Sequence, residues 1–308
     1  MIETERLTKY YGNLAALVDL SLTIKDGDIF GFIGPNGAGK TTTMRILATL
    51  LEPTRGTALI NGLDVTKYGK KVRQAVGYMP DFMGVYDDLK VFEYLEFFAA
   101  AFGIERRKRK SIVDGVLELT DLESKKAAAV DSLSRGMQQR LGLARVLIHD
   151  PKVLILDEPA SGLDPRARIE IRELLRELKR MGKTIMISSH ILSELEEICD
   201  RIGIIEHGRL IFSGTLEEIR SRLGLQSKVR VKVANGQDRA VELLSAMPQI
   251  HSVQILDDCI AVTFKEDQNG DGIIARTLVN GGIDIISLQP ERLKLDDAFL
   301  QLTKGIVH

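Results

Sequence analysis

The sequence of 308 residues has little of several things that would place it in a specialised class. It contains no tryptophan and only two cysteines, Cys199 and Cys259, which stand 60 positions apart with no C-x-x-C pair. This scarcity excludes a disulfide framework, a zinc ribbon and a redox dithiol, and it is typical of a protein of the reducing cytosol.

Long apolar runs and net charge are also missing. No window approaches the roughly 18 to 20 apolar residues of a membrane-spanning helix, and the opening MIETERLTKY lacks the apolar core of a signal peptide. Lys plus Arg number 42 against 43 Asp plus Glu, so no net basic field would attract nucleic acid. We therefore expect a folded, soluble, cytoplasmic chain with no nucleic-acid partner.

What the sequence does contain is an alternation of short apolar runs with segments of helical period. Buried strands that alternate with helices predict an α/β fold whose mostly parallel sheet is covered on both faces. An aromatic-rich stretch, VFEYLEFFAAAF, looks purely helical, and we interpret residues 85–150 as a helical insertion. The expected strands are 17–24, 28–33, 57–61, 75–79, 152–156, 184–188 and 202–206. The expected helices are 41–51, 90–102, 111–119, 137–149, 166–181 and 191–199.

The pattern changes after residue 208. A terminal helix with a glycine stop is followed by VRVKVANG, which alternates as a solvated strand does. We predict two domains, residues 1–225 and a small α+β domain at 226–308. The elements expected in the second domain are strands 229–234, 252–256, 259–264 and 283–288, and helices 238–246, 272–280 and 295–303.

The stretch GPNGAGKT satisfies the pattern G-x-x-x-x-G-K-[ST] between an expected strand and an expected helix. Glycines let the backbone curl so that its N–H groups face inward, and the helix adds its positive end, which makes a cradle for polyphosphate. Lys40 would reach the β and γ phosphates, and Thr41 would place its hydroxyl on Mg²⁺. The alternative is a glycine-rich turn with an incidental lysine. The predicted cradle comprises Gly34, Pro35, Asn36, Gly37, Ala38, Gly39, Lys40, Thr41 and Thr42.

The run VLILDEP places two carboxylates directly after a buried strand, where a crevice opens. Asp157 can serve Mg²⁺, since hard cations prefer carboxylate oxygens, and Glu158 could polarise an attacking water. Adjacent strand residues point to opposite faces, so both can act in one site only where the strand ends. Without the cradle, a helix cap or a solvated turn would be the simpler interpretation.

With these motifs in place, LSRGMQQR at residues 133–140 resembles the LSGGQ-type signature of ATP-binding cassette (ABC) proteins. The resemblance extends over about residues 2–220 and implies an ABC ATPase of the P-loop fold. It implies that Ser134 and Gly136 act on the γ-phosphate held by a second copy of the chain, so that hydrolysis requires a head-to-tail dimer. Glu158, His190 and Lys40 would be the catalytic residues.

The same resemblance assigns three further roles. Tyr11 resembles the aromatic residue that stacks on adenine, with Tyr10 as the weaker candidate and surface packing as the alternative. His190, in ISSHIL, resembles the histidine that contacts the γ-phosphate. The SGLD segment resembles the loop that crosses the dimer interface, and its members are Ser161, Gly162, Leu163 and Asp164.

Two positions depart from the family pattern. Asp81 stands where the family has Gln or Glu; it can still hold a water on Mg²⁺ as a metal ligand, but it is shorter and cannot donate a hydrogen bond. Met137 replaces a Gln of the signature and leaves Ser134 and Gly136 in place. We interpret both departures as tuning rather than loss of function.

The closing stretch ERLKLDDAFLQLT resembles the last helix behind the ATPase domains of the exporter-type ABC-2 branch. This resemblance implies a subunit that binds and hydrolyses ATP with Mg²⁺ and energises a separate integral membrane permease for export, from the inner face of the cell membrane. The helical insertion and the loop around Asp81 would receive the permease, although the aromatic residues could instead be core. The alternative function is a soluble non-transport ABC ATPase with a regulatory or nucleic-acid-associated role.

Overall fold

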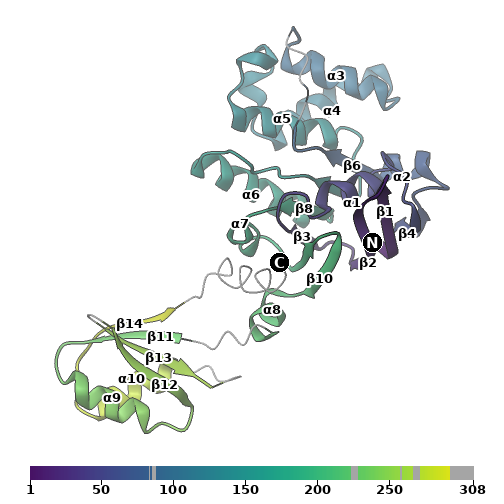
Figure 1. Cartoon of the computed structure of the whole chain (residues 1–308). Coiled ribbons are helices and arrows are strands. Elements are labelled where there is room, and N and C mark those ends of the chain that lie inside the picture. The colour runs from purple at the N-terminus through teal and green to yellow at the C-terminus, as the bar shows by residue number, and fades with distance from the viewer. Residues whose placement is uncertain (83, 85–87, 223–227, 257–258, 266–270, 292–308) are drawn as a thin grey trace. The chain divides into compact units, whose positions relative to one another are not determined.

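The computed structural model describes residues 1–82, 84, 88–222, 228–256, 259–265 and 271–291 (Figure 1). The chain packs as two compact units, Met1–Thr215 and Leu216–His308. The predicted domain boundary at 225 and the predicted helix 295–303 lie outside the described residues. No helix in the described part of the chain is long and apolar enough to cross a membrane.

The first unit is built on a six-stranded sheet in the order β10-β9-β3-β8-β7-β6. All neighbouring strands are parallel except the edge pair β10 and β9, which confirms the predicted α/β fold. Because β8 separates β3 from β7, the loops that follow these three strands open side by side at one edge. The strands are β3 (Ile29–Ile33), β6 (Val76–Met79), β7 (Val153–Leu156), β8 (Thr184–Ser189), β9 (Arg201–Glu206) and β10 (Arg209–Gly214).

A second, antiparallel sheet in the order β2-β1-β4-β5 completes this unit. Side chains from this sheet, from α1 and from one face of the six-stranded sheet form one apolar core. Helix α1 ends at Leu47, before the expected residue 51, and Thr49 follows with a left-handed φ of +62°. The elements are β1 (Ile2–Tyr11), β2 (Leu14–Ile24), α1 (Lys40–Leu47), β4 (Arg55–Ile60), β5 (Leu63–Asp64) and α2 (Gly69–Ala75).

The opposite face of the six-stranded sheet packs against α6 (Pro165–Arg180) and α7 (Leu192–Glu196). The approach is close at Gly31, where an added Cβ would lie 2.9 Å from both Leu195 Cδ1 and Cys199 Sγ. Burial raises the pKa of the Cys199 thiol, so this cysteine is a packing residue rather than a reactive one.

Three helices of the first unit gather on one side of it (Figure 1). They are α3 (Val91–Ala101), α4 (Arg106–Leu119) and α5 (Arg135–Leu147), joined by short 3₁₀ turns at Glu123–Lys125 and Val130–Ser132. Helix α4 begins five residues before the expected start at 111, because the basic run ERRKRK forms its first turns. Helix α5 begins at Arg135 behind Ser134, whose hydroxyl caps it.

The second unit is an α+β arrangement on a four-stranded antiparallel sheet in the order β12-β13-β11-β14. Its described helices α9 and α10 contribute Leu244 and Leu278 to a core that also holds Val231 and Phe264. The elements are α8 (Leu216–Arg222), β11 (Lys228–Val233), α9 (Gln237–Ser245), β12 (Ile250–Leu256), β13 (Cys259–Phe264), α10 (Asp271–Asn280) and β14 (Ile285–Glu291).

Candidate active site

The loop between β3 and α1 is held by close backbone contacts that only glycine permits. An added Cβ on Gly34 would lie 2.3 Å from the Ile205 carbonyl oxygen, and one on Gly39 would lie 2.7 Å from the Ala16 carbonyl oxygen. Gly39 also has a φ of +111° as the N-cap of α1. The loop is therefore fixed between β2 and β9, with the positive end of α1 behind it.

Lys40, the first residue of α1, is buried with 6% of its surface exposed. Its Nζ donates to the Gly34 carbonyl at 2.6 Å and lies 3.5 Å from Glu158 Oε1. A buried ammonium needs such partners, because desolvation would otherwise favour its neutral form. The side chain thus folds back over the loop, where a phosphate oxygen could replace the carbonyl.

Asp157 lies directly after β7 and is 1% exposed. One of its carboxylate oxygens accepts from Thr41 Oγ1 at 2.7 Å, and the other accepts from Ser188 Oγ at 2.6 Å. A hydroxyl beside a carboxylate is a donor set that suits Mg²⁺. No cluster of three or more His, Cys, Asp or Glu residues in the described ranges could hold a metal by itself. Phosphate oxygens and water would have to complete the coordination shell.

Glu158 turns out of the strand at the next position, with a left-handed φ of +51°. Its backbone N–H donates to Ser188 Oγ at 2.9 Å, and its Oε2 lies 2.9 Å from His190 Nδ1. This backbone reversal brings Glu158 and Asp157 to the same cavity, although adjacent residues of a continuing strand would face opposite sides.

The cavity in front of the loop has a volume of about 170 Å³. It brings together residues that are far apart in the sequence, from the loop, from β2 and from the ends of β6 and β7. Its lining residues are Ala16, Pro35, Asn36, Gly37, Ala38, Gly39, Lys40, Thr41, Thr42, Asp81, Asp157 and Glu158.

Asp81, two residues after β6, lines the same cavity as Asp157 and Glu158. Burial raises the pKa of Asp81, and the negative charges of Asp157 and Glu158 raise it further, against the opposing effect of Arg135 and His190. The negative charges of these carboxylates favour a bound cation, whose remaining ligands would have to be phosphate oxygens and water.

Besides Gly34 and His190, the sequence-predicted residues that do not line this cavity are Tyr11, Ser134, Gly136 and the SGLD segment. Tyr11 ends β1 with 43% of its surface exposed, and Lys9 Nζ lies 5.4 Å from its ring centroid. Ser134 Oγ accepts from the Met137 N–H at 3.4 Å at the start of α5. Gly136 lies beside α6, because an added Cβ would be 3.0 Å from Ala167 Cβ.

The SGLD segment, Ser161–Asp164, forms the turn between β7 and α6. Asp164 caps α6 by accepting from the Ala167 N–H at 2.9 Å. Gly162 has a φ of +67°, and an added Cβ there would lie 2.4 Å from the guanidinium carbon of Arg135. This arginine of the signature thus lies over the turn of its own chain.

Sequence reasoning did not single out Ser188, which holds Asp157 and the backbone of Glu158 in place. A signal was available, because β8 carries two buried serines at its carboxyl end in an otherwise apolar run. Carboxyl ends of neighbouring parallel strands meet at one edge, so a polar residue there faces the same crevice.

A glycine-rich loop that holds a buried lysine over a paired Asp and Glu, on a mostly parallel sheet, defines a P-loop ATPase. Similarity to known proteins identifies the family within this class. The ABC transporter family model matches residues 17–161. The chain belongs to the ATP-binding proteins of ABC transporters, and it is the ATPase subunit of such a transporter, as the motif resemblance predicted.

The relatives extend the match to nearly the whole chain. The chain is 37% identical over 306 residues to the bacitracin transport ATP-binding protein BcrA of Bacillus licheniformis, covering 99% of this chain and 98% of that protein. A solved ATP-binding subunit of an ABC transporter matches with a TM-score of 0.66 at 32% identity, over 73% of this chain and 94% of that one. A dimeric structure of a bacterial ABC transporter cassette matches with a TM-score of 0.64 at 26% identity, over 70% of this chain and 99% of that one.

Proposed function

We propose that two copies of this chain close head to tail on ATP and Mg²⁺ and drive a separate integral membrane permease that exports its cargo. The chain would act at the cytoplasmic face of the cell membrane. The observation that carries the proposal is the division of the nucleotide-handling residues into two groups. The cradle, Asp157, Glu158 and His190 lie together, whereas Ser134 and Gly136 lie outside their cavity. A second copy would supply the missing group.

The cavity supports hydrolysis by positioning and charge neutralisation. Loop N–H groups and Lys40 would bind the phosphates, and Lys40 would exchange the Gly34 carbonyl for a phosphate oxygen. Thr41 and Asp157 would hold Mg²⁺, which supplies charge neutralisation when bound. Glu158 would orient or deprotonate the attacking water, and His190, which contacts Glu158, would steady the transferred phosphoryl group. Tyr11 would stack on adenine.

An apolar groove of about 230 Å³ supports the position of the permease. It lies where α3 and α5 approach β6. The Phe102 and His149 rings are stacked there with their centroids 3.9 Å apart, and Arg145 Cζ lies 5.2 Å from the Phe98 ring centroid. Leu50, which lines the groove, is 61% exposed. Phe102 of the aromatic-rich stretch is 44% exposed, whereas Tyr94 of the same stretch is fully buried. The stretch therefore divides between core and surface, and the exposed part is the face we propose for docking.

The export role also draws on the relatives, since the names of several refer to transport or export, including the Nod factor export ATP-binding protein I of Rhizobium sp. strain N33. That protein is 34% identical over 98% of this chain.

Isolation of the chain from its native membranes tests this function. We expect a protein with several membrane spans to copurify. Leu50→Asp or Phe102→Asp should reduce its recovery at least about fivefold, because an unpaired carboxylate in an apolar contact costs more than the roughly 1–3 kcal/mol of an uncharged polar group. Met181→Asp is the matched control, since Met181 is also 53% exposed but lies at the end of α6. Recovery with ribosomes or nucleic acid instead would favour the non-transport alternative.

A further inference from the structure

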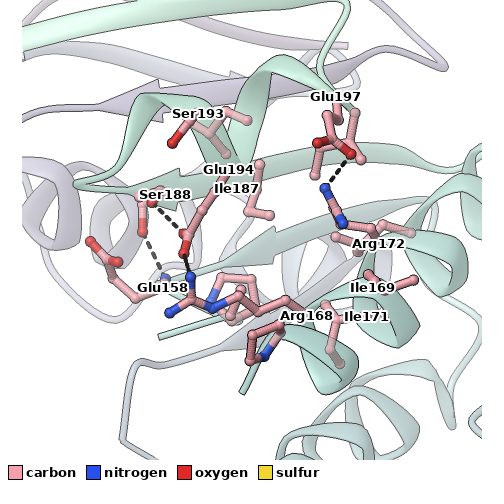
Figure 2. A pocket seen from close by; sticks show the side chains of 17 residues that line it. Glu158, Arg168, Ile169, Ile171, Arg172, Ile187, Ser188, Ser193, Glu194 and Glu197 are labelled. Carbon is pink, nitrogen blue, oxygen red and sulfur yellow. Dashed lines mark hydrogen bonds and ion pairs between the residues drawn. The ribbon is translucent and has the colours of Figure 1, made fainter. Parts of the chain in front are cut away.

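A second cavity, of about 310 Å³, is lined by Ser189 and Ser193, which lie on either side of His190 in the sequence (Figure 2). It is walled by α6 on one side and by the end of β8 and by α7 on the other. Two ion pairs cross between these walls, Arg168 with Glu194 and Arg172 with Glu197. Arg168 and Arg172 lie one helical turn apart on α6, and their other contacts differ.

We propose that Arg168 is a positioning residue for ATP hydrolysis, which holds the His190 turn against Glu158 and ties that turn to the SGLD segment. This positioning role rests on the roles in hydrolysis proposed above for Glu158 and His190. It requires neither the permease nor the direction of transport.

The first link joins Arg168 to both segments. Its Nε donates to the Leu163 carbonyl at 3.0 Å, and its Nη1 lies 3.2 Å from Glu194 Oε1. Leu163 is buried, and the Asp164 cap fixes the start of α6. The Arg168 side chain therefore extends from a rigid part of the backbone. Arg168 thus donates a hydrogen bond to the carbonyl and forms an ion pair, rather than a hydrogen bond, with the carboxylate.

The second link joins Glu194 to the backbone around His190. The other oxygen of this carboxylate accepts from Ser189 Oγ at 3.0 Å, and the same hydroxyl accepts from the Ile191 N–H at 3.0 Å. Ser189 is 3% exposed. Residues on both sides of His190 are therefore held by a hydroxyl whose orientation depends on Glu194.

The third link is the contact of His190 with Glu158. The imidazole side chain is 45% exposed, so little packing restrains the ring, and its Nδ1 lies 2.9 Å from Glu158 Oε2. The direction of the ring is consequently set by the backbone of residues 189–191. Loss of Arg168 would leave the Glu194 carboxylate, only 16% exposed, without its cation. Glu194 would then turn toward water and release Ser189.

Arg168→Ala tests this role against Arg172→Ala, which removes the neighbouring ion pair between the same walls but no contact to Leu163 or Ser189. We expect Arg168→Ala to lower kcat about tenfold or more, since small misplacements of catalytic groups have effects of this size. Arg172→Ala should leave kcat within about twofold of the parent. The dissociation constant for ATP and the melting temperature should be similar in both variants. Equal loss of kcat in the two variants, or no loss in Arg168→Ala, would overturn the proposal.

A second measurement separates positioning from general loosening of the fold. In a His190→Ala background, single-turnover hydrolysis should be no slower, within about twofold, when Arg168→Ala is added, because both changes remove the same contact to Glu158. A further tenfold loss in that background would show that Arg168 acts elsewhere. Turnover of the unmodified chain in the same assay reports the ATPase activity itself, so failure of this inference is distinct from failure of the function.

Discussion

Glu158 occupies a left-handed backbone conformation that costs a non-glycine residue roughly 1–2 kcal/mol. The conformation persists because the backbone N–H is held by Ser188 and the carboxylate lies between Lys40 and His190. Strain of this kind recurs at functional sites, where the surroundings over-determine one geometry. The residue that would act on water is thus fixed in place before any nucleotide binds.

The protonation of a second residue, His149, predicts how the stability of the fold depends on pH. Its Nε2 donates to the Val76 carbonyl at 3.0 Å, while burial lowers the pKa of its imidazole below the ordinary 6.5. The unfolded chain therefore takes up a proton near pH 6.5, and the folded chain does so only at lower pH. Stability that is present above this range is lost as the pH falls through it.

The measurement is the melting temperature of the first unit between pH 7.5 and pH 5.5, for the parent and for His149→Gln. An amide can donate to the Val76 carbonyl but does not titrate in this range. We expect the parent to lose more stability than the variant as the pH falls. Parallel curves would contradict the assigned protonation of His149.

Several site residues could be predicted because their signals are local in the sequence. The spacing of Gly34 and Lys40, and the position of Asp157 after an apolar run, each follow from a few neighbouring residues. The TIMISS run marks Ser188 as a polar residue at a strand end, but its contacts with Asp157 and Glu158 and the role proposed for Arg168 could not be found in this way. Their roles depend on β8 lying next to β7 and on α6 packing against α7, which no short stretch of sequence encodes.

At the scale of elements, β1 was missed because its apolar alternation is interrupted. The register against β2 shifts three times between Thr4 and Tyr10, and Arg6 has a left-handed φ of +45°. Each shift moves the buried side chains out of a strict two-residue period, so the sequence reads as irregular. Helix α2 was missed for a related reason, since Val72 is its one buried residue and one apolar residue makes no period.

Helix α4 offers a test of the element assignment. Gly115 lies in its interior, is exposed, and has no atom within 4 Å of the position that a Cβ would take. Gly115→Ala should therefore raise the free energy of unfolding of the first unit by about 1 kcal/mol, through helix propensity alone.

Calorimetry checks this as a rise of roughly 2–4 °C in the melting temperature. Gly103→Ala is the matched control, because Gly103 also has open space around it but a φ of +77°. Alanine there should lower the melting temperature, since the left-handed region disfavours a Cβ. A change of the same sign at both positions would contradict the described ends of α3 and α4.

At the scale of the whole molecule, the described catalytic groups all belong to the unit Met1–Thr215. Ser134 and Gly136 belong to the same unit but do not line the cavity that holds the cradle. No helix in the described ranges is long and apolar enough to cross a membrane. In the function we propose, a second copy of the chain completes the site and a separate permease carries the cargo.

The most direct test of this account is the oligomeric state of Glu158→Gln in ATP and Mg²⁺, measured by size-exclusion chromatography with light scattering. The amide keeps the shape of the side chain but cannot act as a base, so we expect turnover to fall about 100-fold or more. ATP should remain bound and the chain should accumulate as a dimer.

The control adds Ser134→Arg to Glu158→Gln, which should abolish the dimer and leave ATP binding by the monomer intact. A Glu158→Gln chain that binds ATP and stays monomeric would contradict the head-to-tail dimer, and one that turns over at the parent rate would contradict the role of Glu158.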